Sequence, residues 1–127
     1  AVAKALPELK GLLTGNAIRV PTPNVSMAIM NLNLKKATDK EALNDYLRHI
    51  SLNSKLQNQV DYTASTEIVS TDLVGSRYAG VVDSQATIVD GDRAVLYVWY
   101  DNEFGYSCQV VRVMLAMADI NVPTLPL

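Results

Sequence analysis

The hydrophobic pattern centres on residues 95–107, where a continuous apolar and aromatic run passes into a polar corner. The run 95–99 is rich in β-branched and aromatic side chains, which favours a strand buried on both faces. The polar segment 101–103 follows directly, and apolar positions recur at helical spacing after Ser107. We therefore predict a buried strand, a polar corner and a helix, with the corner side chains held at the end of a rigid element.

Alternating and apolar runs predict further strands on either side of this stretch. In the segment 25–34, Leu32 and Leu34 alternate with asparagines, the period-two pattern of a strand with one polar face. Asp90-Gly91 predicts a hairpin into the strand 94–100, through a type I′ turn with positive φ at both central residues. Shorter strands are predicted at 17–20, 60–63, 77–82 and 86–89.

Helical signals are fewer. The segment 38–41, Thr-Asp-Lys-Glu, is a capping box in which Thr38 would begin a helix. The helix would bury a stripe formed by Leu43, Tyr46, Leu47 and Ile50. Residues 1–6 are predicted to be the end of another helix, which Pro7 interrupts. Strands joined by hairpins and a few helices indicate an α+β fold, a largely antiparallel (mixed) sheet with helices packed on one face.

Composition narrows the class of protein. With 127 residues the chain is one domain or part of one, and 49% apolar and 19% charged residues are ordinary for a globular protein. A net charge of -2 gives no electrostatic reason to expect nucleic acid or a membrane as a partner. One cysteine cannot form an internal disulfide, so the cytoplasm is the default compartment. A helix at the first residue, with no initiator Met, suggests that further chain precedes it.

Two motifs carry a family resemblance. Residues 99–107, Trp-Tyr-Asp-Asn-Glu-Phe-Gly-Tyr-Ser, resemble the C-terminal signature of phosphorylating glyceraldehyde-3-phosphate dehydrogenases. Residues 18–26, Ile-Arg-Val-Pro-Thr-Pro-Asn-Val-Ser, resemble the family's Arg-Val-Pro-Thr segment. The resemblance covers nearly the whole chain but only about the last third of a family member. It implies that residues 1–127 are an incomplete C-terminal catalytic domain, and that the N-terminal dinucleotide-binding domain is absent from this chain.

The resemblance also implies an activity. Family members oxidise a phosphorylated aldehyde by thiolate attack, pass hydride to NAD or NADP, and release an acyl phosphate with inorganic phosphate. They work as homo-oligomers in glycolysis. The family's nucleophile lies in a Ser-Cys-Thr-Thr-Asn-Cys type motif, and no such string occurs here. We therefore expect no catalytic residue in this chain and no turnover by it alone. The alternative is a non-catalytic binding or oligomerisation module derived from the same fold.

Three residues are candidates for ligand contacts. Taken alone, Arg19 would be a solvated or salt-bridged arginine, although guanidinium also suits an anion. The resemblance implies that it binds the substrate phosphate. Asn102 is suited to cap the last helix, and the resemblance implies that its amide also bonds the nicotinamide carboxamide. By the same resemblance, Tyr106 lies on the nicotinamide side of the pocket.

Other reactive side chains suggest no site. Cys108 is predicted to be a small apolar residue on the last helix, and His49 a surface histidine. With one residue of each type, we expect no metal site. Ile18 and the segment 77–85 depart from common family members and suggest a divergent branch, which leaves the aldehyde and the choice of NAD or NADP open.

Overall fold

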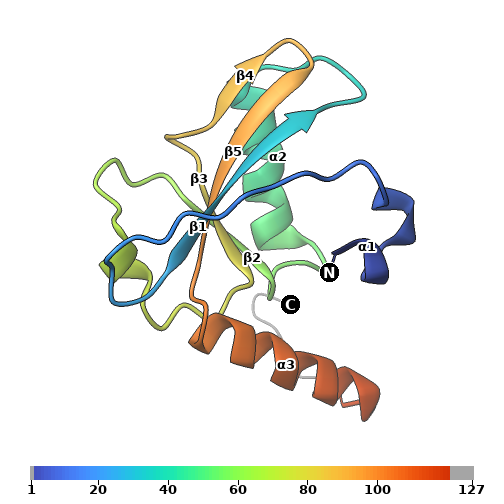
Figure 1. Cartoon of the computed structure of the whole chain (residues 1–127), viewed down its shortest axis with the longest axis vertical. Coiled ribbons are helices and arrows are strands. Elements are labelled where there is room, and N and C mark those ends of the chain that lie inside the picture. The colour runs from blue at the N-terminus through green and yellow to red at the C-terminus, as the bar shows by residue number, and fades with distance from the viewer. Residues whose placement is uncertain (1, 121–127) are drawn as a thin grey trace.

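The computed structural model describes residues 2–120, which form one mixed sheet with helices at its flanks (Figure 1). The order of elements is α1 (Val2–Ala5), η1 (Pro7–Leu9), β1 (Ser26–Asn33), α2 (Lys40–Asn53), β2 (Val60–Thr63), η2 (Ser70–Leu73), β3 (Gly80–Asp83), β4 (Ile88–Asp90), β5 (Arg93–Tyr100) and α3 (Phe104–Met117). The predicted α+β class is confirmed.

Strand β5 is the centre of the sheet. Along one edge it pairs antiparallel with all of β1, from Ser26 opposite Tyr100 to Asn33 opposite Arg93. Its other edge pairs antiparallel with β4 near the strand's start and with β3 near its end. Strand β2 lies parallel to β3, which makes the sheet mixed. The sheet is therefore built around the stretch that the sequence pattern singled out.

The core is small and lies against β3 and β5. All four residues of β3 are buried. In β5, Ala94 and Leu96 are buried, whereas Val95 and Tyr97 are only half-buried. The prediction that β5 is buried on both faces is therefore wrong, since both faces of the strand are only half-buried after Leu96.

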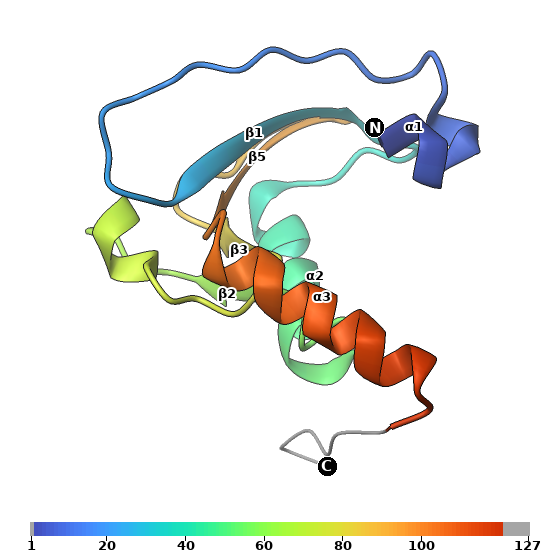
Figure 2. The same ribbon diagram turned by 60° about the horizontal axis from the view of Figure 1, so that its bottom comes forward.

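Helices α2 and α3 lie on the same side of β1 and β5, and the loop after η1 arches over the other side (Figure 2). The cap of α2 differs from the prediction. Asp39, not Thr38, is the N-cap, and its carboxylate accepts from the Ala42 amide at 2.8 Å. The backbone N–H of Thr38 instead donates to the Gly91 carbonyl. The helix thus begins one residue later than predicted, and the Thr38 backbone is bound to the hairpin.

The hairpin between β4 and β5 forms as predicted, but with another turn type. Residues Gly91 and Asp92 are its two central positions, since Asp90 pairs with Arg93. Only Gly91 has a positive φ, at 62°. A type I′ turn requires positive φ at both positions, so the turn has the pattern of type II′, with glycine first.

The segment 17–20 is not a strand. All four residues are exposed, and their backbone makes no ladder hydrogen bond to any described strand. The segment belongs to the long connection that arches over the sheet (Figure 2). An extended, β-branched sequence forms a strand only where a neighbour supplies hydrogen-bonding partners.

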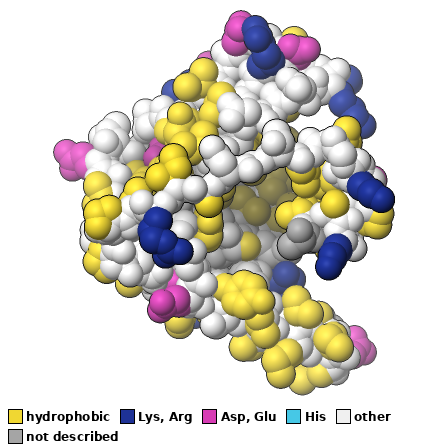
Figure 3. All heavy atoms as spheres, in the orientation of Figure 1, with side chains coloured by type: hydrophobic (Ala, Val, Ile, Leu, Met, Phe, Trp, Pro, Cys, Tyr) yellow, Lys and Arg dark blue, Asp and Glu magenta, His cyan; other side chains and the backbone are white. Residues whose placement is uncertain are grey.

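Helix α3 follows the corner and is anchored mainly at its beginning. The side-chain amide of Gln109 donates to the carbonyls of Asn58, at 3.2 Å, and Arg77, at 2.9 Å. Further along, the apolar side chains of Val110, Val113, Met114 and Met117 are exposed. Figure 3 shows apolar atoms gathered along the protruding helix. Residue 1 of the predicted first helix lies outside the described residues.

Candidate functional site

The polar corner between β5 and α3 is organised by the carboxylate of Asp101. This side chain is 2% exposed and accepts four hydrogen bonds. Its Oδ1 accepts from Asn24 Nδ2 at 3.0 Å and from the backbone N–H groups of Glu103, at 2.9 Å, and Phe104, at 2.8 Å. Its Oδ2 accepts from the Gly75 amide at 2.8 Å. One side chain therefore connects the start of β1, the loop after η2 and the start of α3.

These donors stabilise the charged form of Asp101. The Gly75 amide lowers the pKa most, the Phe104 and Glu103 amides and Asn24 lower it further, and burial acts in the opposite direction. The net effect lowers the pKa of Asp101 to about 2. An anion at this place also suits the N-terminus of α3. The carboxylate is therefore an ionised structural anchor at neutral pH, and its low pKa makes it a poor general base.

The start of β1 is held in an unusual backbone conformation. Val25 has φ of 71° although it is β-branched, and it is 5% exposed. Asn24 stabilises this conformation at both ends of its side chain. Its Oδ1 accepts from the Val25 amide at 2.8 Å, while its Nδ2 donates to Asp101. A non-glycine residue at positive φ persists only where its surroundings hold it, and such residues concentrate at functional sites.

A second side-chain bridge joins β1 to the corner, beside the bridge between Asn24 and Asp101. The hydroxyl of Ser26 donates to Oδ1 of Asn102 at 2.8 Å. The sheet register brings the two together, because Ser26 pairs with Tyr100, two residues before Asn102. Asn102 is exposed, and its Nδ2 has no hydrogen-bond partner among residues 2–120. The amide thus presents two unused N–H donors to the surface at the corner.

The three residues predicted to contact ligands, Asn102, Tyr106 and Arg19, lie in different surroundings. Asn102 does not cap α3, because Asp101 accepts the first N–H groups instead. Tyr106 lies in the first turn of α3 with its side chain 69% exposed. Arg19 is exposed in the connection before β1, and its guanidinium makes no hydrogen bond or ion pair with any described residue. The structure thus places Asn102 and Tyr106 at one corner and shows no direct contact between Arg19 and either of them.

Sequence reasoning missed Asp101, Asn24 and Ser26. All three lie inside the two motifs that carried the resemblance, so their residue types were visible. An aspartate shortly before a helix is a favoured capping signal. The bridges across β1 and β5, however, join residues 76 and 77 positions apart, which no local pattern specifies.

The sequence predicts no reactive site at His49 or Cys108. His49 is exposed, as predicted, with its Nδ1 3.4 Å from the side-chain nitrogen of Asn53. Cys108 is a free thiol and only half-buried.

Among residues 2–120, no group of three or more His, Cys, Asp or Glu side chains is placed to hold a metal ion. No helix in this part of the chain is long and apolar enough to cross a membrane.

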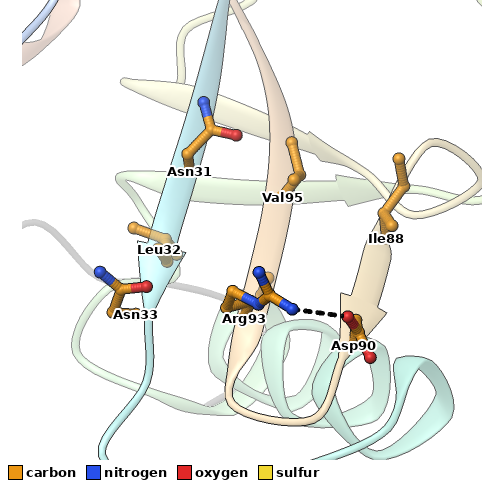
Figure 4. Close-up of a pocket in the computed structure, with 8 residues that line it drawn as sticks. Asn31, Leu32, Asn33, Ile88, Asp90, Arg93 and Val95 are labelled. Atoms are coloured by element: carbon orange, nitrogen blue, oxygen red, sulfur yellow. Dashed lines mark hydrogen bonds and ion pairs between the residues drawn. The ribbon is translucent and has the colours of Figure 1, made fainter.

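A shallow depression of about 340 Å³ lies at the other end of β5. Residues of β1, β4 and β5 line it, and Figure 4 shows Arg93 reaching across to Asp90, with which it forms an ion pair of 3.0 Å. Both side chains of this pair are largely exposed. The lining residues nearest the corner, Asn31 and Val95, lie five and six residues from Ser26 and Asp101, roughly 17–20 Å along the strands. The depression is therefore a separate surface feature.

Comparison with known proteins agrees with this architecture. Residues 1–102 match the family model described as glyceraldehyde 3-phosphate dehydrogenase, C-terminal domain. The match covers most of the chain, including the whole sheet and the corner up to Asn102. The chain belongs to this C-terminal domain family.

Individual proteins that resemble this chain carry names of the same family. The chain is 69% identical over 126 residues to a glyceraldehyde-3-phosphate dehydrogenase-like protein of Pseudomonas aeruginosa, covering 99% of this chain and 27% of the relative. It is 41% identical over 117 residues to a glyceraldehyde-3-phosphate dehydrogenase of Echinococcus multilocularis, covering 91% of this chain and 34% of that protein. A Chlamydia trachomatis glyceraldehyde-3-phosphate dehydrogenase is 41% identical over 115 residues, covering 90% and 34%. The chain thus spans about a third or less of these relatives.

Proposed function

We propose that this chain forms part of the catalytic domain of an NAD(P)-dependent, phosphorylating glyceraldehyde-3-phosphate dehydrogenase. The observation that carries the proposal is the corner after β5. There the exposed Asn102 is held by Ser26 on one side, between the anchored Asp101 and the start of α3. The names of the relatives supply the reaction and the phosphorylated aldehyde. Inorganic phosphate is the second substrate, and a homo-oligomer in the cytoplasm is the expected state.

The corner fits a nicotinamide group. A carboxamide needs a hydrogen-bonding partner, and Asn102 offers two N–H donors that no described residue uses. Tyr106 adds an exposed aromatic ring in the adjacent first turn of α3. The cofactor, when bound, accepts hydride from the substrate. In this proposal the chain's contribution is to orient the ring by holding the carboxamide.

Arg19 supports the substrate side of the proposal. Its exposed guanidinium has five N–H donors, and no described side chain neutralises its charge. Guanidinium binds phosphate oxygens in a bidentate manner. Arg19 lies five residues before Asn24, whose amide ties that segment to Asp101. We infer that Arg19 binds the substrate phosphate, and that the Asn24 anchor limits where the arginine segment can lie.

The chain by itself supplies no nucleophile for this reaction. Its one cysteine, Cys108, lies half-buried on α3, and the family's cysteine motif does not occur in the 127 residues. We therefore expect the isolated chain to show no dehydrogenase turnover.

The experiment compares the isolated chain with the native gene product that contains it. The native product should reduce NAD or NADP when given glyceraldehyde 3-phosphate and inorganic phosphate, and the isolated chain should not. Arg19→Gln in the native product should raise the KM for the aldehyde at least tenfold, since one charge-assisted contact is lost. Arg93→Gln, at the far end of β5, is the matched control and should leave it unchanged. Aldehyde-dependent turnover by the isolated chain would contradict the proposal.

Two exposed features favour the alternative, a non-catalytic assembly module. Among the described strands, β1 is an eight-residue edge strand with one unpaired side, and α3 exposes an apolar face (Figure 3). Such edges and faces promote association. Gel filtration of the native product, with and without NAD, separates the two functions. Association that does not depend on cofactor, in a product without dehydrogenase activity, would favour the module.

A further inference from the structure

Within residues 2–120, only the oxygen of the Asn102 side-chain amide forms a hydrogen bond. An asparagine side chain has one carbonyl oxygen that accepts and one NH₂ group with two donors. Here the oxygen is occupied by the Ser26 hydroxyl at 2.8 Å, and the nitrogen has no partner among residues 2–120. The two ends of the amide are therefore not equivalent in this structure.

Both partners of this bond are held by their backbones. Ser26 is the first residue of β1, paired with Tyr100, and follows the constrained Val25. Asn102 lies between Asp101, which is buried, and Glu103, whose N–H donates to the Asp101 carboxylate. The hydroxyl and the amide thus have little freedom to separate, and the bond between them chiefly determines the rotation about the last side-chain torsion of Asn102.

The opposite amide orientation is less favourable. If the amide turned by 180°, its NH₂ group would face the Ser26 oxygen, and the hydroxyl hydrogen would need another acceptor. The only side-chain hydrogen bond that Ser26 makes within the described residues is the one to Asn102. The observed orientation therefore satisfies the hydroxyl as a donor and leaves both amide N–H groups available to a ligand.

We propose that Ser26 is a positioning residue for the cofactor. Its hydroxyl holds the Asn102 amide with the NH₂ group outward, so that the site selects a ligand group that accepts hydrogen bonds. For a nicotinamide this group is the carboxamide oxygen rather than the carboxamide nitrogen. The inference rests on the proposed function, in which Asn102 contacts the nicotinamide, and adds the residue that orients the contact and its donor–acceptor polarity.

The test measures dissociation constants by calorimetry on the native gene product, with NAD as the probe or NADP if the product prefers it. Ser26→Ala should weaken binding about three- to tenfold, the usual effect of one hydrogen bond. Ser26→Thr, which retains the hydroxyl, should restore most of the affinity. Ser107→Ala is the matched control, since that hydroxyl donates to the Glu103 carbonyl and not to Asn102. Ser107→Ala should leave both the dissociation constant of the cofactor and the KM for the aldehyde unchanged.

Two cofactor analogues test whether the carboxamide oxygen or the carboxamide nitrogen contacts Asn102. The 3-acetylpyridine analogue keeps the carbonyl oxygen and lacks the NH₂ group, so its binding should remain sensitive to Ser26→Ala. The thionicotinamide analogue replaces that oxygen with sulfur, a weak acceptor, and its binding should lose most of the sensitivity. The reverse pattern would overturn the proposed orientation.

Asn102→Ala separates this inference from the proposed function. If its affinity for the cofactor matches that of the wild type, Asn102 makes no nicotinamide contact, and both proposals fail at this residue. If Asn102→Ala weakens binding but Ser26→Ala does not, the contact stands and the role of Ser26 is overturned.

Discussion

Asn24 and Asp101, 77 positions apart in the chain, are joined by a 3.0 Å hydrogen bond from Asn24 Nδ2 to the Asp101 carboxylate. The bond ties the segment before β1 to the corner after β5. Ser26, two residues after Asn24, and Asn102, one residue after Asp101, form a second bridge. The two bridges connect the segment that carries Arg19 with the corner that carries Asn102 and Tyr106. Asn24, Ser26 and Asp101 thus form the structural frame of the candidate site, and Asn102 is the bridging residue that the proposed function assigns to the cofactor.

Replacing Asp101 by Asn should destabilise the chain by about 2–3 kcal/mol, because hydrogen bonds to a charged acceptor are lost. The new NH₂ group would also face backbone N–H donors of Gly75 or of α3. Urea unfolding followed by circular dichroism measures the change. Asp90→Asn is the control and should cost less than about 1 kcal/mol, since that carboxylate makes only an exposed ion pair. Equal effects in the two variants would show that Asp101 is not a special anchor.

The free energy of unfolding should depend on pH through the Asp101 carboxylate. The pKa of Asp101 is about 2 in the folded chain, and an unfolded aspartate titrates near about 3.9. Between these values the unfolded state binds more protons, so stability falls as pH falls from about 4 towards about 2. Unfolding free energies measured at several pH values in this range should fall less steeply for Asp101→Asn than for the wild type. Parallel curves would contradict a lowered pKa.

Gly105→Ala should destabilise the corner although alanine favours helices. A Cβ at this position would lie 2.7 Å from the carbonyl oxygen of Tyr78 and 3.0 Å from that of Ser76. Both contacts are with backbone, so α3 would have to move, at a cost of about 1–3 kcal/mol. Thermal unfolding of Gly105→Ala and of Gly15→Ala tests this, because an added Cβ at Gly15 meets nothing within 4 Å. A stabilised Gly105→Ala would mean that α3 packs less closely than the structure shows.

Variants of two neighbouring residues, Thr38 and Asp39, test which of them caps α2. Asp39→Ala should cost about 1 kcal/mol, because the Ala42 amide loses its acceptor. Thr38→Ala should change stability by less than about 0.5 kcal/mol, since Thr38 contributes its backbone N–H to the Gly91 carbonyl and keeps it in the variant. Chemical unfolding of both variants decides between the cap that the structure shows and the capping box that the sequence predicts.

Much of the secondary structure could be predicted because it depends on neighbours in the chain. Period-two alternation identified β1, the apolar run identified β5, and Asp90-Gly91 identified the hairpin between β4 and β5. Each signal acts over a few residues, where side-chain spacing and turn stereochemistry dominate. The same locality explains the error at 17–20. Its residues suit a strand, but no neighbouring strand supplies partners there.

The sequence by itself determined the fold class, the family and the residue types at the corner, since motifs and periodicity are written in consecutive positions. Only the tertiary structure decided how those residues are used. Pairing of β1 with β5 brings Asn24 and Ser26 to Asp101 and Asn102, and the loop after η2 brings the Gly75 amide. A carboxylate with these donors becomes an anchor instead of a solvated charge, because hydrogen bonds compensate its burial. Those donors come from distant positions, so only the folded register selects them.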